Sequence, residues 1–213
     1  NQNDGMAQRE TLLVDATGGI DPMTPLTSAF KTVTKATAFP LEAKVLTIRG
    51  GQFTTIANQC ESKYDYHRRN ILINRSNVRL LGMHHAVTGE LDHGAPYGGF
   101  VSVGCCANVV VSNCIFTAHR TYRTIGSAGV PVQMGSYDIN CYAVIDVRFL
   151  GVRQDEILDR SRWGVFGSNF CKQILFDGCV ISRSDAHCGV RGYIIRNSVL
   201  GWMGTNTIGF GEM

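Results

Sequence analysis

The sequence has little proline, no long hydrophobic run and almost no charge imbalance, and each shortage excludes a class of protein. Without a stretch of about 20 apolar residues, it predicts no membrane-spanning helix. Its 20 Lys and Arg against 17 Asp and Glu give a net charge of +3 with no basic run, so we expect no nucleic-acid partner. Only 5 prolines accompany 24 glycines, which indicates many tight turns rather than a flexible linker.

Recognised motifs for metal or cofactor binding are also lacking. The 8 cysteines form no Cys-x-x-Cys pair, and no His/Cys spacing suits zinc, no acidic loop suits calcium and no glycine loop suits a phosphate. We therefore predict no metal site and no cofactor, and mostly free thiols. The chain begins at Asn1 without a signal peptide and stops at Met213, which indicates a processed form or a fragment, truncated at its C-terminus.

What the sequence does contain is a repeat. Apolar residues alternate with others on both sides of a turn-prone position, which is typical of two short strands that each have one buried face. The copies span residues 78–85, 109–116, 142–149, 174–181 and 193–200. Their turn positions hold residues that tolerate a left-handed backbone: Gly82, Asn113, Asp146, Gly178 and Asn197.

Stacking these copies predicts three inward-facing rows. The first row is Leu80, Val111, Val144, Phe176 and Ile195; the second is Met83, Cys114, Val147, Cys179 and Ser198; the third is His85, Phe116, Phe149, Ile181 and Leu200. Because one coil cannot bury its apolar face alone, such repeats stack into a solenoid. We predict an all-β fold, a right-handed parallel β-helix over residues 45–213. An antiparallel β-sandwich is the alternative fold.

Residues 1–44 are predicted to form an N-terminal strand and a capping helix. Thr24 followed by Pro25 fits the first positions of a helix, and the apolar residues from Leu26 to Val33 fall on one helical face. Pro40 would end this segment. A short helix here would cover the open end of the solenoid.

Candidate functional residues lie at matching offsets after the third inward row. Arg120 and Tyr122 follow the second copy, and Asp185 and His187 follow the fourth. The third copy places Arg153 and Asp155 at the same offsets, and His119 lies beside this row. In register, these residues would form one polar patch, in which a carboxylate with a second carboxylate or with histidine can perform acid–base catalysis.

We therefore predict Asp185, His187, Asp155 and His119 as catalytic residues. The predicted substrate-binding residues are Arg120, Tyr122, Arg153, Trp163 and Trp202. Two alternatives stay open: Asp185 and His187 as a hydrogen-bonded pair that shapes a loop, and Trp163 as a loop anchor.

Several motifs resemble the pectate-lyase-like β-helix tail spikes and pre-neck appendages of phages of Gram-positive bacteria. The motifs are Trp163 to Lys172, Phe176 to Cys179, Asp185-Ala-His187, Ile195 to Ser198, His119-Arg-Thr-Tyr122 and Met134-Gly-Ser-Tyr-Asp138. The resemblance covers about residues 45–213. It implies a homotrimeric spike in the virion tail, assembled in the host cytoplasm and acting outside the cell.

The resemblance leaves the activity open. It implies a receptor-binding protein that recognises, and in some members degrades, cell-surface polysaccharide or teichoic acid, as a glycoside hydrolase, lyase or phosphodiesterase. The alternatives are a non-catalytic carbohydrate-binding or structural β-helix protein, and a cellular polysaccharide lyase or hydrolase.

Overall fold

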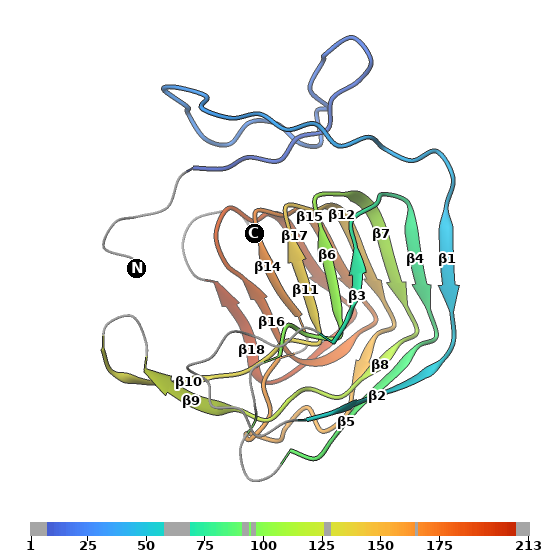
Figure 1. Cartoon of the computed structure of the whole chain (residues 1–213), viewed down its shortest axis with the longest axis vertical. Coiled ribbons are helices and arrows are strands. Elements are labelled where there is room, and N and C mark those ends of the chain that lie inside the picture. The colour runs from blue at the N-terminus through green and yellow to red at the C-terminus, as the bar shows by residue number, and fades with distance from the viewer. Residues whose placement is uncertain are drawn as a thin grey trace.

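The computed structural model describes residues 8–57, 69–90, 94, 97–125, 129–164 and 166–207. Over these residues the chain is all-β, with mostly parallel strands in curled sheets (Figure 1). None of these residues lies in a helix, so nothing in the described part of the chain is a helix that could cross a membrane.

The parallel strands fall into three sets that the chain visits in turn. Set A is β1 (Leu46–Arg49), β4 (Val78–Leu81), β7 (Ala107–Ser112), β12 (Ile145–Leu150), β15 (Lys172–Asp177) and β17 (Arg191–Arg196). Set B is β2 (Gln52–Ile56), β5 (His84–Thr88), β8 (Ile115–Phe116), β13 (Arg153–Gln154) and the first part of β16 (Val180–Ala186). Set C is β3 (Ile71–Ile73), β6 (Val101–Gly104), β11 (Ile139–Tyr142), β14 (Phe166–Asn169) and the second part of β16.

Two further elements complete the sheets. β18 (Val199–Thr207) pairs with β16 along both of its parts, with a register shift between Ile181 and Arg183. β9 (Tyr122–Ile125) and β10 (Pro131–Met134) form an antiparallel two-stranded hairpin beside set C (Figure 1).

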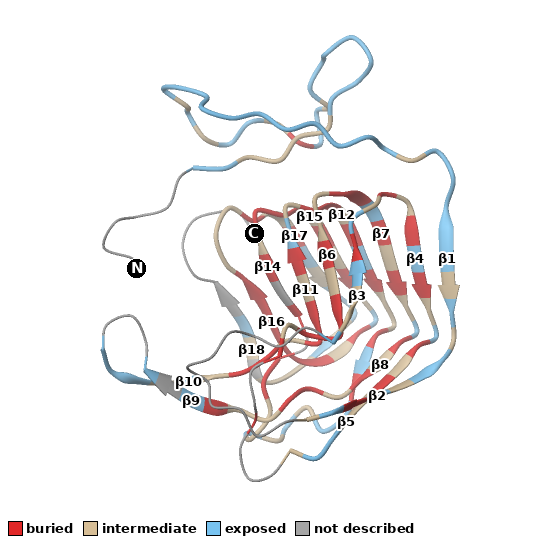
Figure 2. Ribbon diagram, viewed as in Figure 1, coloured by how far each residue is buried: buried red, intermediate tan, exposed pale blue. Residues whose placement is uncertain are grey.

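Alternation along the strands produces the core. β7 and β12 alternate buried with less buried residues (Figure 2), and most of the buried ones belong to the hydrophobic core. Phe149 stacks on Phe176 with ring centroids 4.5 Å apart, and Phe166 meets Phe149 edge-on from set C at 4.8 Å. Cys114 and Cys179 are fully buried free thiols, which confirms that they pack as small hydrophobic residues.

The predicted inward rows are right except at the third copy. Phe149, and not Val144, pairs with Val111 and with Phe176. The same displacement of five residues puts Val152 and Gln154 where the sequence predicted Val147 and Phe149. The error has a physical cause, since Asp146 and Gly151 both adopt the left-handed backbone expected of the turn, with φ of 55° and 62°.

The prediction of an N-terminal capping helix is wrong. Residues 8–45 run irregularly across one end of the strand sets, with a single β-bridge between Val14 and Ile20 (Figure 1). Thr24 closes a turn instead, since its hydroxyl accepts from the Leu13 amide at 2.9 Å and contacts the Asp21 carbonyl. The segment is rich in threonine, and β-branched residues disfavour a helix that lacks an apolar surface to pack on.

Side-chain contacts fasten this N-terminal segment to the strands. Lys172, only 1% exposed, lies 2.5 Å from the Glu10 carboxylate and donates to the Pro25 carbonyl at 2.7 Å. Glu10 also accepts from the backbone and side chain of Thr27. The segment therefore covers the turn that precedes β15 without forming a helix.

Candidate functional site

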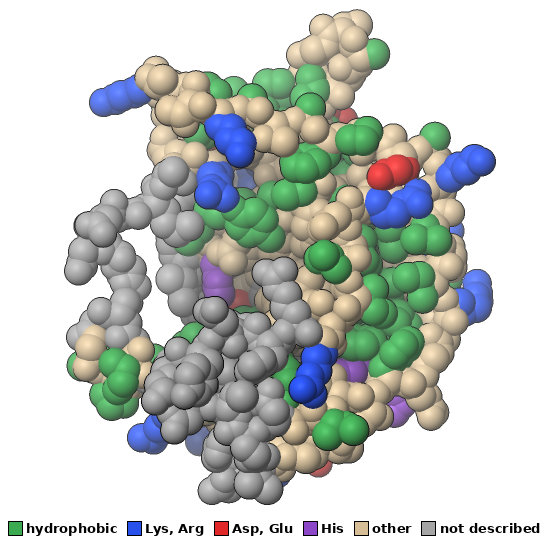
Figure 3. Space-filling model, viewed as in Figure 1, with side chains coloured by type: hydrophobic (Ala, Val, Ile, Leu, Met, Phe, Trp, Pro, Cys, Tyr) green, Lys and Arg blue, Asp and Glu red, His purple; other side chains and the backbone are tan. Residues whose placement is uncertain are grey.

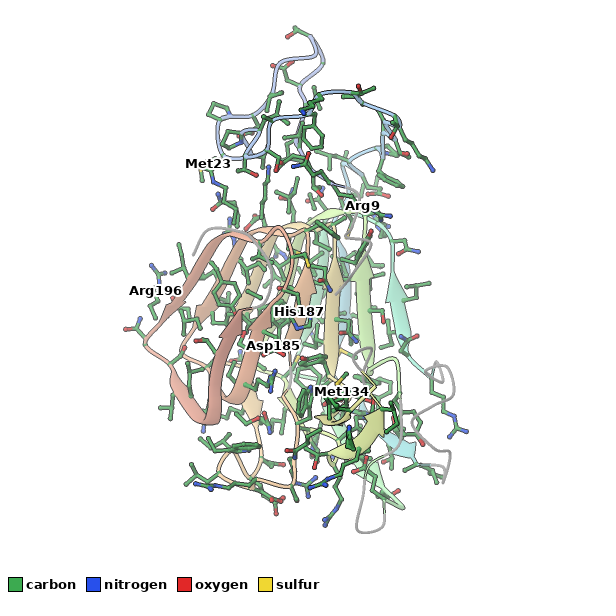
Figure 4. All side chains as sticks on the ribbon, turned by 90° about the vertical axis from the view of Figure 1, so that its left-hand side faces the viewer. Arg9, Met23, Met134, Asp185, His187 and Arg196 are labelled. Carbon is green, nitrogen blue, oxygen red and sulfur yellow. The ribbon has the colours of Figure 1, made fainter. Side chains whose placement is uncertain are left out.

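Asp185 and His187 lie on the outer side of set C, near the middle of the face in Figure 4. Three more side chains gather around them, and we call these five residues the Asp185 cluster: Tyr137, Trp163, Arg183, Asp185 and His187. Arg183, Asp185 and His187 share one face because alternate residues of a strand point the same way. Tyr137 and Trp163 come from the loops before β11 and β14.

Asp185 is a fully buried carboxylate with three side-chain partners. Arg183 Nε lies 2.5 Å from Oδ1, while the Tyr137 hydroxyl donates to Oδ2 and His187 Nε2 lies 3.4 Å from Oδ2. Burial on its own raises the pKa of Asp185, but hydrogen bonds from His187, Arg183 and Tyr137 outweigh it and lower that pKa below its ordinary value. Asp185 is therefore ionised at neutral pH.

Tyr137 remains a hydrogen-bond donor over the whole physiological range. Its burial raises the pKa of the phenol far above the ordinary value, and the neighbouring Asp185 charge raises it further. A phenol held protonated beside a carboxylate keeps that carboxylate ionised.

Trp163 packs on Arg183, and two glycines let the loops of the cluster come close to these side chains. The Arg183 guanidinium lies 4.1 Å from the centre of the Trp163 ring, so it is held between a carboxylate and an aromatic face. A side chain at Gly135 would overlap the Trp163 ring, and one at Gly164 would overlap Arg183. Glycine at both positions lets these loops approach the strand closely.

His187, like Tyr137, is a member of the cluster that solvent partly reaches. Its side chain is 27% exposed, whereas the Asp185 side chain is 0% exposed. The His187 amide donates to the Ser168 carbonyl at 2.9 Å, which ties the residue to β14, and the Tyr137 ring meets the imidazole edge-on at 6.2 Å. Asp185 lies at Nε2 of the imidazole, and the partly exposed ring can act as a proton acceptor or donor.

The other predicted site residues lie outside this cluster. His119 is 1% exposed, and its Nδ1 lies 2.9 Å from Glu90, whose other oxygen accepts from the Arg120 amide. Tyr122 is buried in β9. Trp202 lies in β18, and its backbone amide donates a hydrogen bond to the Ile157 carbonyl.

Arg153 and Asp155 are exposed residues of set B and the turn after it, and no hydrogen bond or ion pair joins either to Asp185 within the described ranges. Their predicted place depended on the displaced third copy. Since Gln154 and not Phe149 matches Phe116 and Ile181, the offsets that led to Arg153 and Asp155 start from the wrong residue.

The sequence reasoning missed Tyr137, Arg183 and Glu90. Arg183 could have been found, because it shares the strand face of Asp185 at a spacing of two residues. Tyr137 gave a weaker signal, namely its place between a glycine and an aspartate in Gly135-Ser-Tyr-Asp138. Among the described residues, no three His, Cys, Asp or Glu side chains gather to hold a metal ion.

Comparison with solved structures finds distant likenesses. No protein-family model and no curated protein matches this sequence. A crystal structure of a "putative glycosyl hydrolase" from Parabacteroides merdae is similar over 78% of this chain and 80% of that one, at 10% identity and a TM-score of 0.37. A likeness this weak carries no argument about function, which depends on the site itself.

Proposed function

We propose that this chain is a polymer-recognising right-handed parallel β-helix, a receptor-binding spike of a virion tail that acts on cell-surface polysaccharide or teichoic acid. The strand pairing supports the β-helix. The successive triplets β3–β4–β5, β6–β7–β8 and β11–β12–β13 pair in parallel, set by set, as coils would. The virion setting and a homotrimer come from the family resemblance alone.

The observation that carries the proposed activity is a buried, ionised carboxylate beside a partly exposed imidazole. Asp185 can orient His187 and place a carboxylate beside its imidazole, as in the pairing of a catalytic histidine. His187 would then take a proton from, or give one to, the polymer at the bond that breaks. Arg183 is committed to Asp185 and Trp163, so it serves the cluster rather than the substrate.

Binding without cleavage is the second candidate, and a specific observation favours it. The Asp185 oxygens already have Arg183, Tyr137 and His187 as partners, and the described contacts bring no second carboxylate into the cluster. The two-carboxylate arrangement of most glycosidases therefore does not apply to these five residues. The cluster would then be a rigid surface that recognises sugars.

One experiment separates the two candidates. Purified cell-wall polysaccharides and teichoic acids are incubated with the wild type, with His187→Gln and with the control His84→Gln, which changes a histidine of β5 outside the cluster. If the chain is an enzyme, the wild type and control shorten a polymer, and His187→Gln is slower by about 10²–10⁴-fold. Binding without shortening supports the second candidate, and neither binding nor shortening of any polymer contradicts both.

A further inference from the structure

A group of largely buried polar side chains lies next to the loops of the Asp185 cluster. We call it the histidine network: Thr55, His85, Glu90, His119 and Asp138. His85 and Asp138 are 0% exposed, and His119 is 1% exposed. Buried charged groups are costly unless they are paired.

The first half of the network pairs His85 with Asp138. His85 Nε2 lies 2.8 Å from the Thr55 hydroxyl, and its Nδ1 lies 2.9 Å from Asp138 Oδ1. The second contact has the distance of an ion pair but not the direction of a hydrogen bond, and the Asp138 oxygens have no other described partner. Asp138 is thus paired with His85, whose ring stacks on Phe100 at 4.1 Å.

The second half pairs His119 with Glu90. The Glu90 carboxylate binds His119 Nδ1 and the Arg120 amide, both at 2.9 Å, so it fixes the backbone on both sides of the residue 119 carbonyl. Tyr97 stacks on the His119 ring at 4.9 Å. In the first half, the order of Thr55, His85 and Asp138 resembles a nucleophile–base–carboxylate chain. Its burial denies it a substrate.

Both halves connect to the loops that cover Asp185. Asp138 follows Tyr137 directly, and its carbonyl accepts from the Phe100 and Val101 amides at 2.8 and 2.9 Å. The His119 carbonyl accepts the Trp163 amide at 2.9 Å, and the Ala118 carbonyl accepts from Arg162 at 3.1 Å. One imidazole–carboxylate pair therefore anchors Tyr137, and the other anchors Trp163.

We infer that His85 with Asp138, and His119 with Glu90, are positioning residues that hold Tyr137 and Trp163 in place around Asp185. The inference rests on the proposed function only in treating that cluster as the polymer site. His119 acts at this site from behind, through the Trp163 backbone, and contacts no polymer. Two buried histidines, one on β5 and one in the segment between β8 and β9, thus set the shape of one surface.

The test uses isosteric changes, Glu90→Gln and Asp138→Asn, and reads the site in two ways. Trp202→Phe is added to all proteins for fluorescence, so that Trp163 is the remaining tryptophan, and acrylamide quenching reports its exposure. Polymer affinity is measured separately without Trp202→Phe. The matched control is Glu10→Gln, which weakens a buried ion pair that touches the N-terminal segment and not the cluster.

We expect Glu90→Gln to make Trp163 as quenchable as an exposed tryptophan and to weaken polymer binding about tenfold. Asp138→Asn should weaken binding to a similar degree with a smaller change at Trp163. Glu10→Gln should leave both readouts unchanged. The inference would be overturned if a folded Glu90→Gln showed the same quenching of Trp163 as the wild type. It would also be overturned if Glu10→Gln showed changes as large as those of Glu90→Gln.

The two readouts separate this inference from the proposed function. If the wild type binds no polymer but Glu90→Gln still exposes Trp163, the positioning role stands and the polymer site fails. If neither variant folds, amide hydrogen exchange in the wild type decides. The Trp163 amide should be protected as strongly as those of Phe100 and Val101, and fast exchange at Trp163 would refute the role of His119.

Discussion

At the scale of single residues, the central feature is one carboxylate that stays ionised inside the protein. Asp185 does so because a guanidinium, a phenol and an imidazole converge on it. The same contacts make it a poor subject for a simple catalytic test. Removing its charge leaves Arg183 buried without its partner, so activity and stability would fall together.

Asp185 should make stability depend on pH in a defined direction. Its folded pKa lies below the unfolded value, so its contribution is present above the unfolded pKa and is lost as pH falls through the folded pKa. We expect Asp185→Asn to lose about 3 kcal/mol of unfolding free energy at pH 7. Free aspartate titrates at about pH 4. The free energies of unfolding of the two proteins, measured with urea, should converge well below that pH. A gap that is constant from pH 7 to pH 3 would contradict the assignment.

Phe176 should be among the most costly core residues to truncate. It is 1% exposed and touches aromatic rings of Phe149, Phe166 and Tyr193. Phe176→Ala should cost about 3–5 kcal/mol through lost burial and a cavity. The control Ile194→Ala, at a residue 50% exposed on the neighbouring strand, should cost less than about 1 kcal/mol. Chemical denaturation measures both, and similar losses would show that the strand faces are assigned incorrectly.

At the scale of elements, the sequence predicted strands well and their alignment less well. Alternation located the inward faces, and Val111, Phe176 and Cys179 are buried as predicted. Alignment failed at residues 142–149 because two positions, Asp146 and Gly151, both adopt a left-handed backbone. A turn-prone residue marks a left-handed position without telling which of two such positions in a coil it is.

The candidate site was predictable to the same degree. Asp185 lies near the end of β16 and His187 directly follows that strand, so local spacing alone put them together. Tyr137 and Trp163 reach them through loop packing between distant segments, which one sequence does not specify. The polar residues at Arg153 and Asp155 were drawn in only by the misplaced third copy.

The loop packing depends on Gly135 and Gly164. Gly135→Ala puts a methyl group into the Trp163 ring, so we expect the loop to lift and polymer binding to fall about tenfold or more. In the control Gly104→Ala, the atom nearest to the added Cβ is Asn74 Oδ1 at 3.3 Å. This variant should bind as the wild type does. Binding isotherms of the three proteins, with circular dichroism to confirm folding, check this. Unchanged binding by folded Gly135→Ala would mean that Trp163 does not shape the site.

At the scale of the whole molecule, charge is nearly balanced and most of the described thiols are buried. The basic side chains in Figure 3 are spread around that face and do not gather on it. Of the cysteines in the described ranges, five are buried and two, Cys105 and Cys188, are partly exposed, all of them free. Cys60 lies outside the described residues.

The thiols should therefore react in two groups. Burial raises the pKa of Cys106 and of Cys171 to about 12, so these thiols stay protonated and unreactive in the folded protein. Cys105 and Cys188 should react first with a thiol reagent, and the buried five only after denaturation. Counting thiols under denaturing, non-reducing conditions tests this, and a count of two or fewer would indicate disulfides instead.

The contact between Glu10 and Lys172 has a consequence for the order in which this protein is made. Glu10 leaves the ribosome long before Lys172 does, yet its side chain has its buried cationic partner only once β15 exists. Each of these strands pairs with the previous strand of its own set, so the sets can grow as synthesis proceeds. The N-terminal segment, made before the strands, is thus among the last to find its place, and it must stay unattached while the strands are built beneath it.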